Sequence, residues 1–162
     1  MGCDIHAFVE YQYPTKNWCS FADVDLGRHY GIFGLLSKGV RSEFYESYPA
    51  KGAPADLGHR ALSEFTYFVT DRTEYQEGYI SKEDAEASVA KGYTEWVGDR
   101  RIRRSDWHSA SWVTTNQLET LLSLPFVVKE WKDLEDYKAT LEMMKCFQSH
   151  GFECRLVFWF DN

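Results

Sequence analysis

The sequence predicts an α+β fold in which a small mixed or antiparallel sheet includes both terminal strands and carries helices on one face. Two observations lead to this class. The chain begins with an alternating segment at residues 3–13 and ends with a continuous apolar segment at 153–160, and both patterns are typical of strands. Between them lie segments with helical spacing. With 162 residues, the chain is expected to form a single globular domain, 1–162.

The first strand is expected to have one apolar and one mostly polar face. Alternation with a period of two residues places successive side chains on opposite faces of a sheet. The apolar face holds Cys3, Ile5, Ala7, Val9 and Tyr11, and the other face holds Asp4, His6, Phe8, Glu10 and Gln12. Pro14 ends this strand, and residues 18–28 are expected to form a loop.

A short helix is expected over residues 29–38, because four of its last seven residues are large and apolar. Gly39 is placed to end it. Gly31 and Gly34 disfavour the helix unless another segment packs closely against them.

The middle of the chain is expected to hold a loop, a strand, a helix and an extended segment. Two prolines and two glycines place a structured loop at 46–60, and residues 62–70 are apolar and aromatic enough for a strand. Ser81 begins a helix that runs to residue 90, and residues 100–113 are expected to be extended.

The last part of the chain is expected to hold two helices and a central strand. Thr114 and Gln117 form a capping-box pattern, which begins a helix bounded by Pro125. Residues 153–160 are apolar on both faces, which is typical of a strand with neighbours on both sides. The longest helix is expected over 132–149, and its apolar stripe is Leu134, Tyr137, Leu141, Met144 and Phe147.

The composition excludes several functional classes. Lys and Arg number 18 against 25 Asp and Glu, and the net charge of −7 disfavours the coating of duplex nucleic acid. No apolar run reaches 18 residues, so no membrane association is expected. The start of the chain lacks a secretory pattern, and the cysteines at 3, 19, 146 and 154 form no C-x-x-C pair. These observations predict reduced thiols and a cytoplasmic protein.

A metal site is one interpretation of the polar face of the first strand. Asp4 and His6 leave that face together, about 6.5–7 Å apart at the backbone, and both are ligands for divalent cations. If the terminal strands pair antiparallel, Asp161 approaches them, and His108 is the fourth candidate ligand. The simpler interpretation is a polar pair at a strand edge.

The segment 106–112 places a carboxylate, an imidazole and two hydroxyls close to two indoles. A nucleophilic Ser109 with His108 as its base is disfavoured, because neighbours in an extended chain point apart. No Gly-x-Ser-x-Gly pattern is present either. A ligand-binding strand whose hydroxyls donate to phosphate or sugar fits the segment better. The arginines at 100, 101, 103 and 104 are either phosphate clamps or a solvated basic loop.

Four motifs carry a resemblance to a known family. They are Met1-Gly2-Cys3-Asp4-Ile5-His6, the stretch from Arg28-His29-Tyr30 through Phe33 to Gly39-Val40-Arg41, Asp106-x-His108-Ser109-x-Ser111-Trp112, and the end Val157-Phe158-Trp159-Phe160-Asp161-Asn162. Together they resemble an uncharacterised family of small proteins encoded by bacteriophages and prophages. Lys51 departs from the pattern, which has Arg there. The resemblance implies action inside an infected bacterial cell and is compatible with a role against host defence.

Three functions follow from these features. The favoured one is a module that binds a small anionic, phosphorylated ligand of the nucleotide type, such as a host immune signal, and needs no cofactor. Its ligand-binding residues would be Arg28, Arg41, Lys51, Arg103, Arg104, His108, Ser109, Ser111 and Trp112. The first alternative is a metal-dependent hydrolase or phosphodiesterase with a divalent metal on Asp4, His6, His108 and Asp161.

The second alternative is a protein-interaction inhibitor of a host defence enzyme, acting through its acidic surface. No motif assigns a catalytic residue, and a homo-oligomer is compatible with the sequence.

Overall fold

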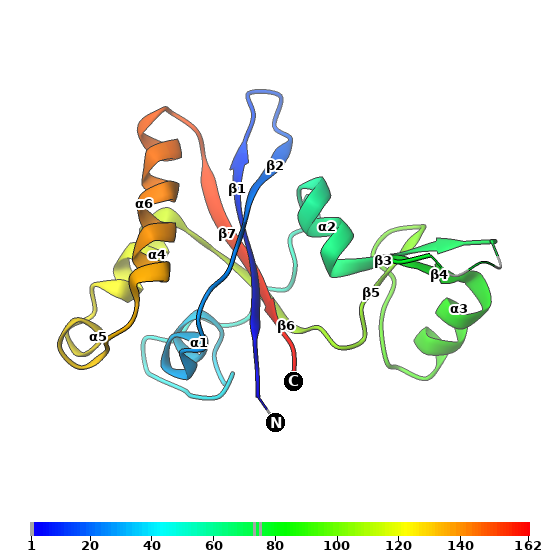
Figure 1. The fold of residues 1–162 in the computed structure, drawn as a ribbon, viewed down its shortest axis with the longest axis horizontal. Coiled ribbons are helices and arrows are strands. Elements are labelled where there is room, and N and C mark those ends of the chain that lie inside the picture. The colour runs from blue at the N-terminus through cyan, green and yellow to red at the C-terminus, as the bar shows by residue number, and fades with distance from the viewer. Residues whose placement is uncertain (1, 73, 75) are drawn as a thin grey trace. The chain divides into compact units, whose positions relative to one another are not determined.

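The structure, a computed structural model, describes residues 2–72, 74 and 76–162 (Figure 1). Its contacts divide the chain into two compact units. We call the chain up to Gly58 together with His108–Asn162 the first unit, and His59–Trp107 the second unit. The fold class is confirmed, because helices and sheets both occur and the sheet of the first unit contains both terminal strands. The single domain stays a prediction.

The sheet of the first unit has four strands in the order β2-β1-β7-β6, and every neighbouring pair is antiparallel. The strands are β1 (Ile5–Gln12), β2 (Trp18–Val24), β6 (His108–Thr114) and β7 (Cys154–Phe160). All residues of β7 are buried, as expected for a strand with two neighbours. The register places Ile5 opposite Phe160 and Tyr11 opposite Cys154, so the two ends of the chain meet at one end of the sheet.

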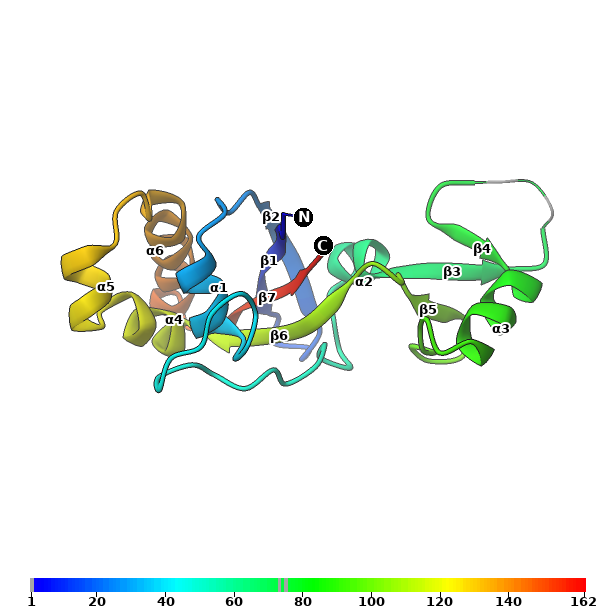
Figure 2. The ribbon, with the colours of Figure 1, turned by 90° about the horizontal axis from the view of Figure 1, so that it is seen from below.

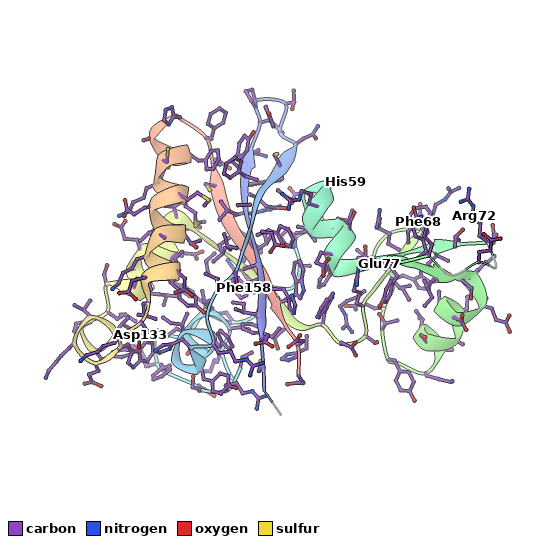
Figure 3. The ribbon with its side chains drawn as sticks, viewed as in Figure 1. His59, Phe68, Arg72, Glu77, Asp133 and Phe158 are labelled. Carbon is purple, nitrogen blue, oxygen red and sulfur yellow. The ribbon has the colours of Figure 1, made fainter. Side chains whose placement is uncertain are left out.

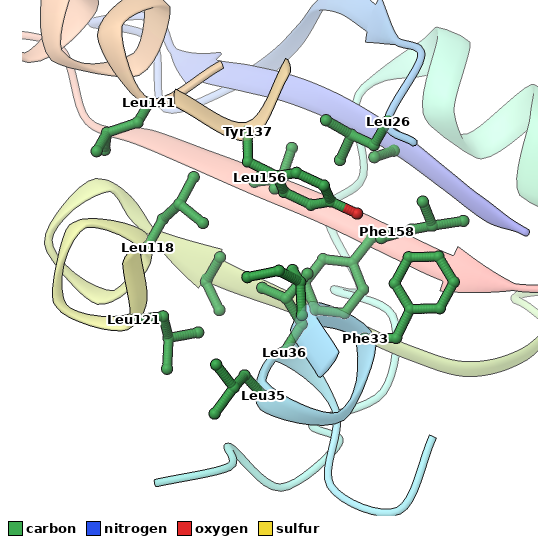
Figure 4. Close-up of a cluster of buried hydrophobic side chains, with 14 of the residues drawn as sticks. Leu26, Phe33, Leu35, Leu36, Leu118, Leu121, Tyr137, Leu141, Leu156 and Phe158 are labelled. Carbon is green, nitrogen blue, oxygen red and sulfur yellow. The ribbon is translucent and has the colours of Figure 1, made fainter. Parts of the chain in front are cut away.

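Four helices of the first unit lie on one side of this sheet (Figure 2). They are α1 (Tyr30–Leu36), α4 (Thr115–Leu122), α5 (Pro125–Glu130) and α6 (Glu135–Ser149). The predicted stripe of α6 is confirmed, since Tyr137, Leu141 and Met144 are buried in the core that these helices form with β7 (Figure 4). The hydroxyl of Tyr137 donates to the carbonyl of Gly27 over 2.9 Å, so this buried polar atom is satisfied.

Both glycines of α1 meet close neighbours, as their presence in a helix required. A Cβ at Gly31 would lie 2.6 Å from the ring of Trp131, and one at Gly34 would lie 2.4 Å from the carbonyl oxygen of Ser42. The chain therefore folds back tightly over α1 between residues 37 and 42. Gly39 has φ +88°, a conformation that glycine adopts without strain, and it follows the helix as predicted.

The second unit has its own small mixed sheet, β4-β3-β5. Its elements are α2 (His59–Phe65), β3 (Thr66–Thr70), β4 (Tyr79–Ser81), α3 (Lys82–Ala90) and β5 (Arg101–Arg103). Ser81 caps α3 as predicted, with its hydroxyl accepting from the amide of Asp84. Phe68, Arg72 and Glu77, labelled in Figure 3, belong to this unit.

Three predicted segments need correction. Residues 62–70 are half helix and half strand, because α2 ends at Phe65. The extended segment 100–113 is two strands, β5 and β6, which belong to different sheets. Residues 18–24 form β2 instead of a loop, because Pro14 lies in a hairpin turn in which the amide of Tyr13 donates to the carbonyl of Asn17.

The face of β1 that was expected to be mostly polar is largely buried. Glu10 is fully buried and Phe8 nearly so, and Phe8 stacks on Trp159 of β7. The carboxylate of Glu10 accepts from the amide of Gly58 over 2.8 Å, so part of the predicted loop 46–60 lies against this face.

Candidate functional site

The pairing of β1 with β7 brings three of the predicted polar residues together. Asp161 accepts from the amide of Asp4 over 3.0 Å through one carboxylate oxygen, and its other oxygen lies 3.0 Å from Nε2 of His6. The amide of Asp161 donates to the carbonyl of Asp4 over 3.2 Å. The expectation that antiparallel pairing places Asp161 beside Asp4 and His6 is therefore met.

The same geometry does not assemble the four metal ligands proposed from the sequence. Both carboxylate oxygens of Asp4 are bound by Arg28, one by Nε and one by Nη2. The imidazole of His108 stacks on Phe160, whereas His6 stacks on Trp159. Because Phe160 and Trp159 are neighbours on a strand, their rings lie on opposite faces of the sheet. Among the described residues, no group of three or more His, Cys, Asp and Glu side chains is placed to hold a metal ion.

The ion pair of Asp4 with Arg28 predicts a pH dependence. The hydrogen bond from Arg28 holds the pKa of the Asp4 carboxyl below its usual range of about 3.9. The pair therefore stabilises the fold above that range, and its contribution is lost as the pH falls through the lowered pKa. We expect Asp4→Asn to be less stable than the wild type at pH 7, with a difference that shrinks below about pH 4. Urea unfolding from pH 7 to pH 2 measures it.

The difference should be modest, because the two side chains are 55% and 48% exposed and solvent screens them. A gap between wild type and variant that stays constant down to pH 2 would contradict the assignment. The exposed Asp25→Asn variant serves as the control for a simple change of net charge.

A pocket of about 370 Å³ lies at this end of the first unit. The loop after α1, the start of β6 and the end of the chain form it, and we call it the Arg41 pocket. Its lining residues are Lys38, Gly39, Val40, Arg41, His108, Ser109 and Asn162. Nη2 of Arg41 donates to the carbonyl of Gly2 over 3.2 Å and to the side-chain oxygen of Asn162 over 3.4 Å. Nζ of Lys38 lies 3.0 Å from the carboxylate of Glu43.

A β-bulge shapes the strand side of the Arg41 pocket. His108 is opposite Phe160 and Ser111 is opposite Phe158, so three steps along β6 match two steps along β7. Ser109 takes up the extra residue with φ +49°, which is uncommon for a residue other than glycine. As a result, Nδ1 of His108 and Oγ of Ser109 lie 3.0 Å apart.

The imidazole of His108 is held by packing on its other side. Its ring stacks on Phe160 with the ring centres 6.0 Å apart. Its Nε2 atom is buried and has no hydrogen-bond partner among the described residues.

The structure thus corrects one argument made from the sequence. Adjacent residues of a regular strand point apart, and on that ground a pairing of Ser109 with His108 was disfavoured. The bulge makes the strand irregular at this point and turns the two side chains toward each other.

The remaining ligand-binding candidates lie outside the Arg41 pocket. Arg28 is bound to Asp4, as described above. The ammonium of Lys51 lies 3.6 Å from the ring centre of Trp112, and the Lys51 amide donates to the buried hydroxyl of Ser111 over 3.1 Å. Burial lowers the pKa of Lys51. Lys51, Ser111 and Trp112 therefore hold the loop around Lys51 against the edge strand β6. These structural contacts explain the three residues without a ligand.

Arg103 and Arg104 belong to the second unit and have structural partners there. Nη1 of Arg103 donates to the carbonyl of Trp107 and, over 3.2 Å, to that of Arg104. The guanidinium of Arg104 lies 4.6 Å from the ring centre of Tyr67, and its Nη2 donates to the carbonyl of Ser63 over 3.4 Å. These contacts favour the interpretation of a basic segment that stabilises its own fold.

The predicted set therefore separates into two parts. Arg41, His108 and Ser109 line one pocket, whereas the others are used elsewhere. Lys38 and Asn162 also line that pocket, and neither is among the predicted ligand-binding residues, although Asn162 belongs to the motif at 157–162. No pattern in the sequence marks Lys38. Both residues reach the pocket only through the turn after α1 and the register of β7.

We compared the chain with protein families, curated proteins and solved structures. No family model, curated protein or solved structure matches the chain. Within the described residues, none of the helices has the length and apolar character needed to cross a membrane.

Proposed function

We propose that this protein binds a small phosphate-bearing ligand of the nucleotide type in the Arg41 pocket. One observation carries the proposal. Four described residues other than glycine have positive φ, namely Lys16, Arg41, Ser109 and Asp133, and two of these four line the same pocket. Such conformations are strained, and they cluster at sites where a ligand is held.

The chemistry of the lining supports an anionic ligand. Arg41 supplies a planar cation that suits phosphate oxygens, Lys38 a second cation, and Ser109 a hydroxyl donor. Because the whole chain carries a net charge of −7, such a ligand needs local cations to bind. The volume of about 370 Å³ falls within the range of small-molecule pockets. The resemblance to phage proteins extends the proposal to removal of a nucleotide immune signal from an infected cell.

Replacement of Arg41 tests the proposal, although it also removes the hydrogen bonds of the guanidinium to Gly2 and Asn162. Glycine adopts φ +63° without strain, so Arg41→Gly removes the guanidinium and relieves the backbone. We expect Arg41→Gly to bind the ligand about 10- to 100-fold more weakly, the usual loss for a hydrogen bond to a charged group. Equilibrium dialysis against a panel of linear and cyclic nucleotides, with inorganic phosphate included, measures this.

Lys16→Gly is the matched control. Lys16 has φ +66° and lies in the turn between β1 and β2, so this variant removes one positive charge and relieves the same strain away from the pocket. It should bind as the wild type does. Absence of any retained or converted nucleotide with the wild-type protein would contradict the proposal and favour the protein-interaction alternative. A product formed only with added metal and lost with chelator would instead favour the metal-dependent hydrolase.

A further inference from the structure

We infer that Ser109 is a nucleophile toward phosphoryl groups, with His108 as its base. The inference rests on the proposed function, since it concerns a ligand in the Arg41 pocket, and adds a covalent step to it. Its basis is the 3.0 Å separation of Oγ of Ser109 from Nδ1 of His108, in a pocket that also holds Arg41. A serine hydroxyl becomes a useful nucleophile when a neighbouring base accepts its proton.

The imidazole of His108 lies within reach of the serine proton, with Nδ1 3.0 Å from Oγ. A neutral imidazole has one N–H and one lone pair, and the ring can accept the proton of Ser109 when the lone pair is on Nδ1. In that tautomer the hydrogen is on Nε2, which is buried and has no hydrogen-bond partner among the described residues. Stacking on Phe160 fixes the plane of the ring.

The backbone of Ser109 suits the role of nucleophile. Its φ of +49° and its place in a β-bulge hold the side chain out of the alternation of the strand. Strained conformations of this kind occur where a side chain must be presented to a ligand. Arg41, which also lines the pocket, would bind the phosphoryl oxygens and stabilise the charge that develops on them.

The reaction would proceed in two steps. Oγ of Ser109 attacks phosphorus, the bond from phosphorus to the leaving oxygen breaks, and the serine proton passes through Nδ1 of His108 to that oxygen. Ser109 is then a phosphoserine ester. In the second step, water attacks the ester phosphorus and gives a proton to His108. The bond from phosphorus to Oγ then breaks, His108 passes that proton to Oγ, and the phosphate is released.

An alkyl fluorophosphonate probe tests the first step without knowledge of the ligand. Attack by Oγ forms the bond to phosphorus and expels fluoride, while His108 takes the proton. We expect time-dependent addition of one probe to the folded protein, found at Ser109 by peptide mass mapping. His108→Phe should slow this labelling about 100-fold, the usual contribution of a general base. The new phenyl ring keeps the stacking on Phe160. Loss of Nε2 breaks no hydrogen bond, because that atom has no partner among the described residues.

The chain contains an internal comparison. Ser149 is also followed by a histidine, with Oγ of Ser149 3.3 Å from Nδ1 of His150, but this pair is exposed at the end of α6. Nδ1 of His150 donates to the carbonyl of Cys146 over 2.7 Å, so it has no lone pair for the proton of Ser149. Ser149 should react far more slowly than Ser109. Ser109→Gly, which tolerates the positive φ, should remain folded and lose the label.

Equal labelling of Ser109 and Ser149, no labelling of Ser109, or a rate that His108→Phe leaves unchanged would overturn the inference. This failure is distinct from failure of the proposed function. A protein that retains a nucleotide through Arg41 and leaves Ser109 unlabelled keeps the binding function and loses the nucleophile.

Discussion

Replacement of Arg155 by alanine is expected to lower the free energy of unfolding by about 3–5 kcal/mol. Arg155 is 5% exposed, and its guanidinium bonds the carboxylate of Glu10, which has no exposed surface. The same carboxylate accepts from the hydroxyl of Ser20 and the amide of Gly58. Loss of the cation leaves Glu10 as a buried charge without its counterion, which is the source of the large cost.

The arrangement also fastens a loop to the sheet. Nη1 and Nη2 of Arg155 donate to the side chain and the carbonyl of Asp56, over 2.9 and 3.1 Å. The guanidinium lies 3.8 Å from the ring centre of Trp18. Arg155→Ala should therefore release the chain around Asp56 and make it sensitive to proteases under native conditions.

Non-additivity distinguishes a buried ion pair from ordinary packing. Glu10→Met combined with Arg155→Met should cost less than Arg155→Ala alone, because neither charge is then stranded. The exposed pair of Glu135 with Lys138 is the control, and Glu135→Ala should cost about 1 kcal/mol or less. Urea unfolding of these variants, and of Glu10→Met and Arg155→Met singly, gives the values. A double Met variant as unstable as the sum of its two single Met variants would contradict the ion-pair account.

Local patterns were enough to predict much of the fold. The apolar spacing of α6, the capping box of α4 and the doubly apolar β7 each depend on residues close in sequence, and all three predictions are confirmed. The strand β2 was missed because its pairing with β1 depends on a hairpin turn that contains Pro14. The boundary inside 62–70 was missed because α2 passes directly into β3, with no glycine or proline between Phe65 and Thr66.

The candidate site was predictable only in part, for a related reason. Asp4, His6 and Asp161 meet because two strand predictions were right and the strands run antiparallel. The contact between His108 and Ser109 depends on a bulge in the register of β6 against β7. The bulged residue is serine. A glycine at this position would have indicated a positive φ, but a serine does not.

Phe160→Ala is expected to destabilise the protein by about 3–5 kcal/mol and also to disable the Arg41 pocket. Phe160 has no exposed surface, and its ring packs against Phe33 with ring centres 5.1 Å apart and under His108 at 6.0 Å. Removal of the ring leaves a cavity in the core and takes away the support of the imidazole. Thermal unfolding measures the loss of stability. The rate of fluorophosphonate labelling measures the reactivity of Ser109 in the pocket.

Phe158→Ala separates these two effects, because Phe158 is equally buried and lies two residues earlier on the same face of β7. Its ring is 5.8 Å from that of Phe160, and it is opposite Ser111 instead of His108. Both variants should lose about 3–5 kcal/mol. At a temperature where both are folded, only Phe160→Ala should slow labelling of Ser109. If both variants label at the same rate, the ring of Phe160 stabilises the core without positioning His108.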